Sequence, residues 1–284
     1  MPYLNLRQSG YYAILLFCCL AVGSIGHSGS RNRLKHHVDA PAHPIIYESM
    51  LLGGSRGGKW LSSTATARMV HGGETYQQYS LLGRAGHFVG GKASKDGSIN
   101  GQQLRIGLNR AREAQPDNVI GVSGSWNGIP RPVRRIRTPS TTDIAVVRRI
   151  LDLHNMRETR VQITGCFRVD LRADRRQATI IIAGNINSNM LGDSSPKRGD
   201  YSCAILYWSG ASKSPALVGD FCFGAPGRSD TIELIKLLAI ADLNGDGTME
   251  IVLASYFYEN QLYEVYSLDG DKLRQVLSGG DGDA

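Results

Sequence analysis

The pattern of hydrophobic and polar positions predicts a protein built mainly of strands, with two short helices in its N-terminal part. Alternating or continuous apolar runs indicate strands within residues 74–82, 86–94, 103–108 and 118–124. Turn residues separate these runs, and Gly is abundant at 34 of 284 residues. We therefore expect an α+β region over 45–160, followed by a part made of strands alone.

Two segments have helical periodicity. The stronger runs from Asp143 to about Met156, with Thr141 or Thr142 as the expected N-cap. Its apolar side is predicted to consist of Ile144, Val147, Ile150, Leu151 and His154. A shorter helix is predicted within 61–73, capped by Ser62 or Ser63 and ended by Gly72.

From Val161 onward the chain repeats one pattern: apolar strand, polar loop, apolar strand, turn, strand, turn, strand. The two units cover 161–228 and 229–284, and "SLDGDK" supplies an Asp-Gly hairpin signal in the second. We expect two tandem four-stranded antiparallel meanders, each similar to one blade of a β-propeller. Two such blades make an incomplete or atypical propeller.

The second unit contains the loop "ADLNGDGTME", which has the composition of a calcium site. Asp242, Asn244 and Asp246 alternate, and the intervening glycines allow a tight turn. The carbonyl of Thr248 and the side chain of Glu250 complete an all-oxygen set of candidate ligands, as Ca²⁺ prefers. An Asx-rich turn that needs no ion is the alternative. The spacing differs from that of an EF-hand, whose Glu ligand stands at the twelfth position.

Alignment of the first unit on this loop places Asp170 on Asp242 and Arg172 on Asn244. It also places Asp174 on Asp246, Arg175 on Gly247 and Ala178 on Glu250. The spacing is retained, but most of the oxygen ligands are lost. The first unit therefore keeps the scaffold of the loop without its predicted site.

The pattern Asp-x-Asn-x-Asp-Gly-x-x-Glu between two apolar strands resembles the calcium loop of FG-GAP/VCBS-type repeats. The resemblance is clear for residues 232–260, with a degenerate echo at 161–224. It implies integrin-like β-propeller blades with structural Ca²⁺, in a family with many exported bacterial proteins. The chain departs from the family pattern after the loop, where Leu253-Ala254-Ser255 stands in place of Gly-Ala-Pro.

The N-terminus has the layout of an export signal. Residues 1–26 carry one cation, an apolar core and small residues suited to cleavage after Gly23 or Gly26. An uncleaved anchor is the alternative to cleavage, and no later segment approaches the length of a membrane span. Residues 27–44 are polar and predict a flexible leader. We therefore expect a secreted or otherwise extracytoplasmic protein.

Charge is divided unevenly along the chain. From Arg31 to Arg228 there are 28 Lys and Arg against 14 Asp and Glu, whereas 229–284 has 3 against 11. The candidate anion-binding residues lie in and beyond "RPVRRIR": Arg131, Arg134, Arg135, Arg137, Arg148 and Arg149. An unknown protein or an anionic polymer is the expected partner. Nucleic acid is not, because no nucleic-acid-binding motif is present.

Three cysteines lie outside the signal segment: Cys166, Cys203 and Cys222. An odd number allows at most one disulfide and one free thiol in a monomer; Cys203–Cys222 is the first candidate pair, and the sequence leaves the pairing open. No pattern of Cys and His indicates zinc.

The sequence thus predicts an exported, calcium-binding β-repeat protein with a non-catalytic binding or structural role. The first alternative is an extracytoplasmic hydrolase that uses the N-terminal region, where "VHGGE" at 70–74 and "GVSGS" at 121–125 partly match esterase motifs. The second is a binder of anionic polysaccharide or lipid through the Arg131–Arg149 segment.

Overall fold

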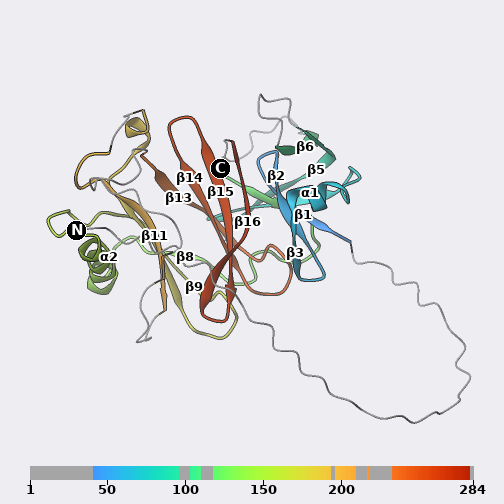
Figure 1. Cartoon of the computed structure of the whole chain (residues 1–284). Helices are drawn as coiled ribbons and strands as arrows, with labels where there is room; N and C mark the ends of the chain where they lie inside the picture. Colours follow the sequence, from blue (N-terminus) through green and yellow to red (C-terminus); the bar gives the residue numbers. More distant parts are fainter. Residues whose placement is uncertain are drawn as a thin grey trace, which may run out of the picture. The chain divides into compact units, whose positions relative to one another are not determined.

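Three antiparallel sheets make up the described part of the chain in the computed structural model (Figure 1). The structure describes residues 41–95, 103–109, 118–192, 196–208, 216–217 and 232–281. Contacts divide the chain into Met1–Asp39 and Ala40–Ala284, and every described residue belongs to the second unit. The predicted export signal lies outside the described residues, as does nearly all of the predicted leader.

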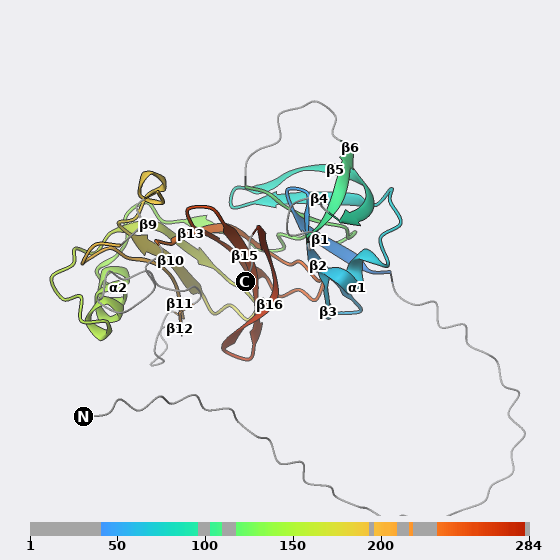
Figure 2. The same ribbon diagram turned by 45° about the horizontal axis from the view of Figure 1, so that its top comes forward.

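The first sheet contains seven strands in the order β1-β7-β4-β5-β6-β2-β3, and β1 pairs with β2 as well. Their bounds are β1 His43–Tyr47, β2 Met50–Arg56, β3 Lys59–Ser62, β4 Thr75–Ser80, β5 Gly83–Lys95, β6 Leu104–Asn109 and β7 Ile120–Val122. The short helix α1 (Ser63–Ala67) lies beside β1, β2 and β3 (Figure 2). The N-terminal strands thus form one large sheet rather than further four-stranded blades.

Both faces of β1 and β2 are buried, which explains the nearly continuous apolar run "IIYESMLL". Ile46 and Leu51 pack with Tyr76, Phe88 and Ile106 in a small core within this first part of the chain. Their neighbours along the two strands point the opposite way and join another core with the third sheet. Alternate residues of β1 and β2 therefore belong to two different hydrophobic cores.

The second sheet has the order β12-β11-β10-β9-β8. Its strands are β8 (Arg134–Arg135), β9 (Ile163–Val169), β10 (Ala178–Gly184), β11 (Ser202–Trp208) and β12 (Ala216–Leu217). β9 to β12 form the predicted meander, and β8 adds an edge strand to it. The helix α2 (Thr141–Leu153) covers one face of this sheet (Figure 2).

The third sheet is the second predicted meander, in the order β13-β14-β15-β16. Its strands are β13 (Leu234–Ala241), β14 (Glu250–Tyr256), β15 (Gln261–Asp269) and β16 (Lys272–Asp281). Asp269 pairs with Lys272 across a turn at Gly270, as the Asp-Gly hairpin signal predicts. The expectation of a mainly β fold with two tandem four-stranded antiparallel meanders is confirmed.

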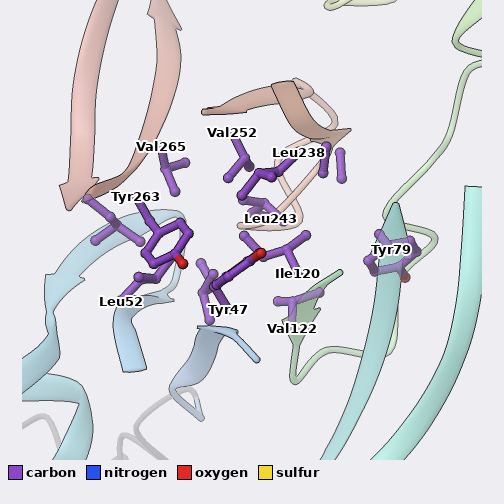
Figure 3. Close-up of a cluster of buried hydrophobic side chains, with 14 of the residues drawn as sticks. Tyr47, Leu52, Tyr79, Ile120, Val122, Leu238, Leu243, Val252, Tyr263 and Val265 are labelled. Atoms are coloured by element: carbon purple, nitrogen blue, oxygen red, sulfur yellow. The ribbon is translucent and has the colours of Figure 1, made fainter. Parts of the chain in front are cut away.

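The third sheet contributes its two faces to two different cores. Ile251 and Leu253 pack against residues of the second sheet, including Ile180 and Leu206. Val252 and Ala254 pack instead against the first sheet, in a core where the rings of Tyr47 and Tyr263 stack 4.1 Å apart (Figure 3). The last meander of the sequence thus lies between the two sheets that precede it.

The helices differ from prediction at their ends. Ser140, not Thr141 or Thr142, is the N-cap of α2, and it forms a capping box with Asp143. The helix ends at Leu153 because Asn155 takes a left-handed conformation with φ 58°. Ile144, predicted on the apolar side, is 45% exposed. α1 ends at Ala67, well before Gly72.

The candidate disulfide between Cys203 and Cys222 is wrong. Cys203 is a free, fully buried thiol near the start of β11, and Cys166 is a second free buried thiol, on β9. Both belong to the core beneath α2. Burial raises the pKa of Cys203 to about 12, and burial together with the Asp143 charge raises that of Cys166 to about 11. Cys222 lies outside the described residues.

Candidate metal centre

The predicted calcium loop joins β13 to β14 at the edge of the third sheet. Gly245 has φ 78° and Gly247 has φ 86°, a left-handed conformation that costs other residues about 1–2 kcal/mol each. These glycines let the chain reverse tightly enough for the side chains before and between them to turn into the loop. The two glycines therefore determine the tight turn of this loop.

The loop's own amides fix the three alternating side chains. The two carboxylate oxygens of Asp242 accept hydrogen bonds from the N–H groups of Gly245 and Gly247, at 2.7 and 3.0 Å. Asn244 Oδ1 accepts from the Asp246 amide at 3.0 Å, and Asp246 Oδ1 accepts from the Thr248 amide at 2.7 Å. Asn244 Nδ2 also donates to Asp246 Oδ2 at 2.9 Å. Hydrogen bonds within the turn therefore hold the oxygens of all three side chains close to the loop backbone.

Glu250, at the start of β14, lies under the loop and is fully buried. Its carboxylate accepts from the Leu243 amide at 2.8 Å and from Ser267 Oγ at 3.0 Å. Burial, with the negative charges of Asp246 and Asp242, raises its pKa to about 8. Burial also raises the pKa of Asp242, and the charge of Asp246 adds to that rise. The environment of Asp242 and Glu250 therefore disfavours the ionised form of both carboxyl groups.

The donor set matches hard cations in chemistry, and its present geometry is that of a hydrogen-bonded turn. Within the described part of the chain, no three His, Cys, Asp or Glu side chains are grouped as metal ligands. Asn244 is an amide, and both Glu250 oxygens already accept hydrogen bonds. Every carboxylate, amide and carbonyl oxygen of the loop has a second lone pair beyond the one used in its hydrogen bond. Asp242, Asn244, Asp246 and the Thr248 carbonyl therefore fit Ca²⁺ as ligands, with Glu250 behind them.

The loop between β9 and β10 has left-handed residues at the same two positions. Ala173 and Arg175 have φ 62° and 63°, at the positions that align with Gly245 and Gly247. Asp170 accepts from the Arg172 and Arg175 amides at 3.1 and 3.0 Å, much as Asp242 does in the second loop. The alignment of the two loops therefore holds in space as well as in sequence.

Two arginines of the first loop, Arg172 and Arg176, contact the third sheet. Arg172 lies 3.5 Å from Asp271, in the turn between β15 and β16, and Arg176 also pairs with Asp271, at 2.9 Å. Asp174 keeps the bond that its counterpart Asp246 makes, because it accepts from the Arg176 amide at 2.9 Å, and it also pairs with the Arg176 side chain at 2.8 Å. The first loop is thus held by ion pairs to the third sheet.

Arg131 bridges the two loops. Its Nε donates to the Asp170 carbonyl at 2.5 Å, and its Nη2 donates to the carbonyls of Leu171 and Gly247 at 2.8 and 2.6 Å. The Met249 amide also donates to the Leu171 carbonyl at 2.9 Å. One guanidinium group therefore links the backbones of both loops.

Trp126 supports the candidate metal loop from the other side. Its Nε1 donates to the Asp242 carbonyl at 2.8 Å, and its ring lies against Gly245, where an added Cβ would sit 3.0 Å from it. The Asp242 amide in turn donates to the Gly128 carbonyl at 2.7 Å. Residues 126–128 thus position the loop, and nothing in the sequence pattern indicates this role.

The structure separates the six candidate anion-binding arginines. The guanidinium group of Arg131 donates to backbone carbonyls of the two loops. Arg148 donates to the carbonyls of Met156, Arg157 and Thr159. The other four are exposed: Arg134, Arg135, Arg137 and Arg149. The single basic patch expected from sequence is therefore smaller than predicted.

The segment that partly matches an esterase oxyanion motif is a closed turn. The amides of His71 and Gly72 both donate to the Glu74 carboxylate, at 2.7 and 2.9 Å. The amide of Gly73 donates to the Gly90 carbonyl at 2.7 Å. All three N–H groups are engaged, which leaves none to stabilise an oxyanion. In the other segment, the Ser123 carbonyl bonds to the His43 ring.

Comparison with known proteins returns no family model, no curated protein and no solved structure that matches this chain. No described helix has both the length and the apolar character needed to cross a membrane.

Proposed function

We propose that the protein is an exported calcium-binding β-repeat protein in which the ion has a structural, non-catalytic role. The observation that carries this proposal is the oxygen cluster of the second loop. Asp242, Asn244 and Glu250 are buried there, and the pKa of each of the two carboxyl groups is raised. A divalent ion would favour the ionised form of these buried carboxyl groups, and hard oxygen donors select Ca²⁺ over softer metals.

The position of the loop explains why an ion there would stabilise the fold. Leu243 is fully buried in the core shared with the first sheet, and Met249 is buried in the core shared with the second. The loop therefore anchors side chains in two cores at once. An ion that rigidifies it would stabilise the packing of the third sheet on both sides.

We also propose that residues 161–224 and 232–260 are two units of the FG-GAP/VCBS type. The matching left-handed positions and the equivalent roles of Asp170 and Asp242 support this proposal. The first unit would be a degenerate copy without an ion. Secretion of the chain, with processing after Gly23 or Gly26, tests its expected extracytoplasmic location.

The proposal is tested by thermal melting in Ca²⁺ and in chelator. An ion present at one hundred times its dissociation constant stabilises by about 2.7 kcal/mol. For a unit of this size, that corresponds to a rise in Tm of about 5–11 °C. Asp246→Ala should abolish the rise.

Asp174→Ala is the matched control, because Asp174 holds the aligned position in the first loop. It should leave the calcium-dependent rise intact. A wild-type Tm that is equal in Ca²⁺ and in chelator contradicts the proposal, as does an equal loss of the rise in the two variants.

A further inference from the structure

A groove unrelated to the metal loop runs along the second sheet where it meets β13. One part has a volume of about 430 Å³, and its floor includes Phe167, Ile182 and Leu237. A second part of about 520 Å³ extends past Ile136 and Ile163. The two parts share Leu82, Arg135, Thr164 and Gly165 in their lining, so they adjoin. Their size is that of a site for one small molecule, about 300–1,000 Å³.

The floor of the groove is apolar and retains a little solvent exposure. Phe167 is 6% exposed, and Ile182 and Leu237 are each 7% exposed. At the mouth, Leu82 in the turn between β4 and β5 is 93% exposed. An apolar side chain this exposed beside an apolar groove offers contact area to a hydrophobic ligand.

Among the described residues that line this groove, the charged ones are all positive: Arg135, Arg137 and Lys236. Within the described part of the chain, no ion pair engages Arg135 or Arg137, whereas Lys236 lies over the ring of Tyr256. Two arginines at the edge of an apolar floor are suited to an anionic headgroup.

Strand geometry explains why these two arginines share one side. Arg135 lies opposite Phe167 in the pairing of β8 with β9, so both side chains point to the same face. Arg137, two residues further on, lines the second part of the groove. Arg134 lies opposite Arg168 and belongs to the other face, towards α2 and Asp143.

We propose that this groove binds a long-chain fatty acid, with the acyl chain on the floor formed by Phe167, Ile182 and Leu237. The carboxylate lies at Arg135 and Arg137. An anionic polysaccharide shares the charge but has no apolar part to cover the floor. The site shares no residue with the calcium loop.

The test is titration of the full chain with a fluorescent dansyl-labelled undecanoic acid, followed by displacement with palmitate. Arg135→Gln/Arg137→Gln removes the headgroup contact, and Leu82→Asp places an acid at the mouth. Each should weaken palmitate binding at least tenfold. Arg149→Gln and Leu153→Asp are matched controls, because both residues are exposed on α2 and neither lines the groove. They should change the affinity less than twofold.

We expect saturable binding of one palmitate per chain, with hexadecanol at least tenfold weaker and heparin unable to displace the probe. Three results would overturn the proposal: no saturable binding, equal affinity for palmitate and hexadecanol, or equal losses in groove and control variants. Displacement by heparin or by lysophosphatidylglycerol, but not by palmitate, would assign the groove to a different ligand and also overturn it. Melting curves of each variant confirm that it is folded.

Discussion

Arg131→Met tests the inference that one guanidinium group holds the two loops together. The substitution keeps most of the apolar stem, so packing of the side chain is largely preserved. It removes three charge-assisted hydrogen bonds, of 2.5, 2.8 and 2.6 Å, to carbonyls of Asp170, Leu171 and Gly247. These carbonyls belong to both loops, so the loss falls on the junction of the second and third sheets.

The magnitude follows from the environment of the group. A hydrogen bond to a charged group contributes about 1.5–3 kcal/mol when buried. Arg131 is half-buried, and the Leu171 carbonyl keeps the bond from Met249, so water replaces part of the loss. We expect the free energy of unfolding to fall by about 3 kcal/mol. The Tm should fall by about 6–12 °C.

Urea denaturation in chelator measures the effect without a contribution from metal. Arg131→Lys should recover only about 1 kcal/mol, because an ammonium group lacks the planar fork that reaches three carbonyls. Arg149→Met, at an exposed arginine of α2, serves as the control for charge alone. If Arg131→Met stays within about 0.5 kcal/mol of wild type, the carbonyl contacts do not hold the loops and the reasoning fails.

Three further predictions concern other parts of the fold. Burial acts to raise the pKa of Asp143, but hydrogen bonds and a nearby positive charge outweigh it and the pKa is lowered. The stability from this group should therefore be present above its unfolded pKa, near 3.8, and be lost as the pH falls through the lower folded value. Asp143→Asn should remove this acid-side loss in urea titrations from pH 2 to 7, and an unchanged pH profile would contradict it. Ala173→Gly should stabilise by about 1 kcal/mol because Ala173 is left-handed, whereas Ala145→Gly in α2 should destabilise by a similar amount; equal signs would contradict the conformational argument. Alkylation followed by mass spectrometry should leave Cys166 and Cys203 unmodified in native protein and modify both in denaturant. A cross-linked peptide containing Cys203 would refute the free thiol.

Much of the fold is predictable because the pattern of apolar residues in each strand shows which of its faces are buried. The run "ATIIIAG" of β10 is buried throughout, as expected of a central strand covered on both faces. The Asp-Gly turn sets the register of the last hairpin. The capping box of α2 is also written in the sequence as Ser140-x-x-Asp143, although the predicted cap was one or two residues too late.

The arrangement of the sheets is not predictable in the same way. The continuous apolar run of β14 implies burial on both faces, but it does not say which sheets cover them. The last meander packs between the earlier sheets through contacts that are distant in sequence. Local periodicity carries no information about such contacts.

The candidate metal site is also only partly predictable from the sequence. The turn, the glycines and the inward side chains follow from the spacing of Asp242, Asn244 and Asp246. The supports from Trp126 and Arg131 do not, because each acts on residues 116 positions further along the chain. Ser267 of β15 donates a hydrogen bond to Glu250, and the sequence does not indicate this role either. The sequence therefore identifies the donors, and only the fold identifies what holds them.

A crystal structure of the protein grown in calcium chloride tests the central claim most directly. The account predicts one ion within about 2.3–2.6 Å of oxygens from Asp242, Asn244, Asp246 and Thr248. It also predicts no ion at the first loop, where Arg172 and Arg175 replace the corresponding positions. Ordered water alone at the second loop, at saturating calcium, would contradict it.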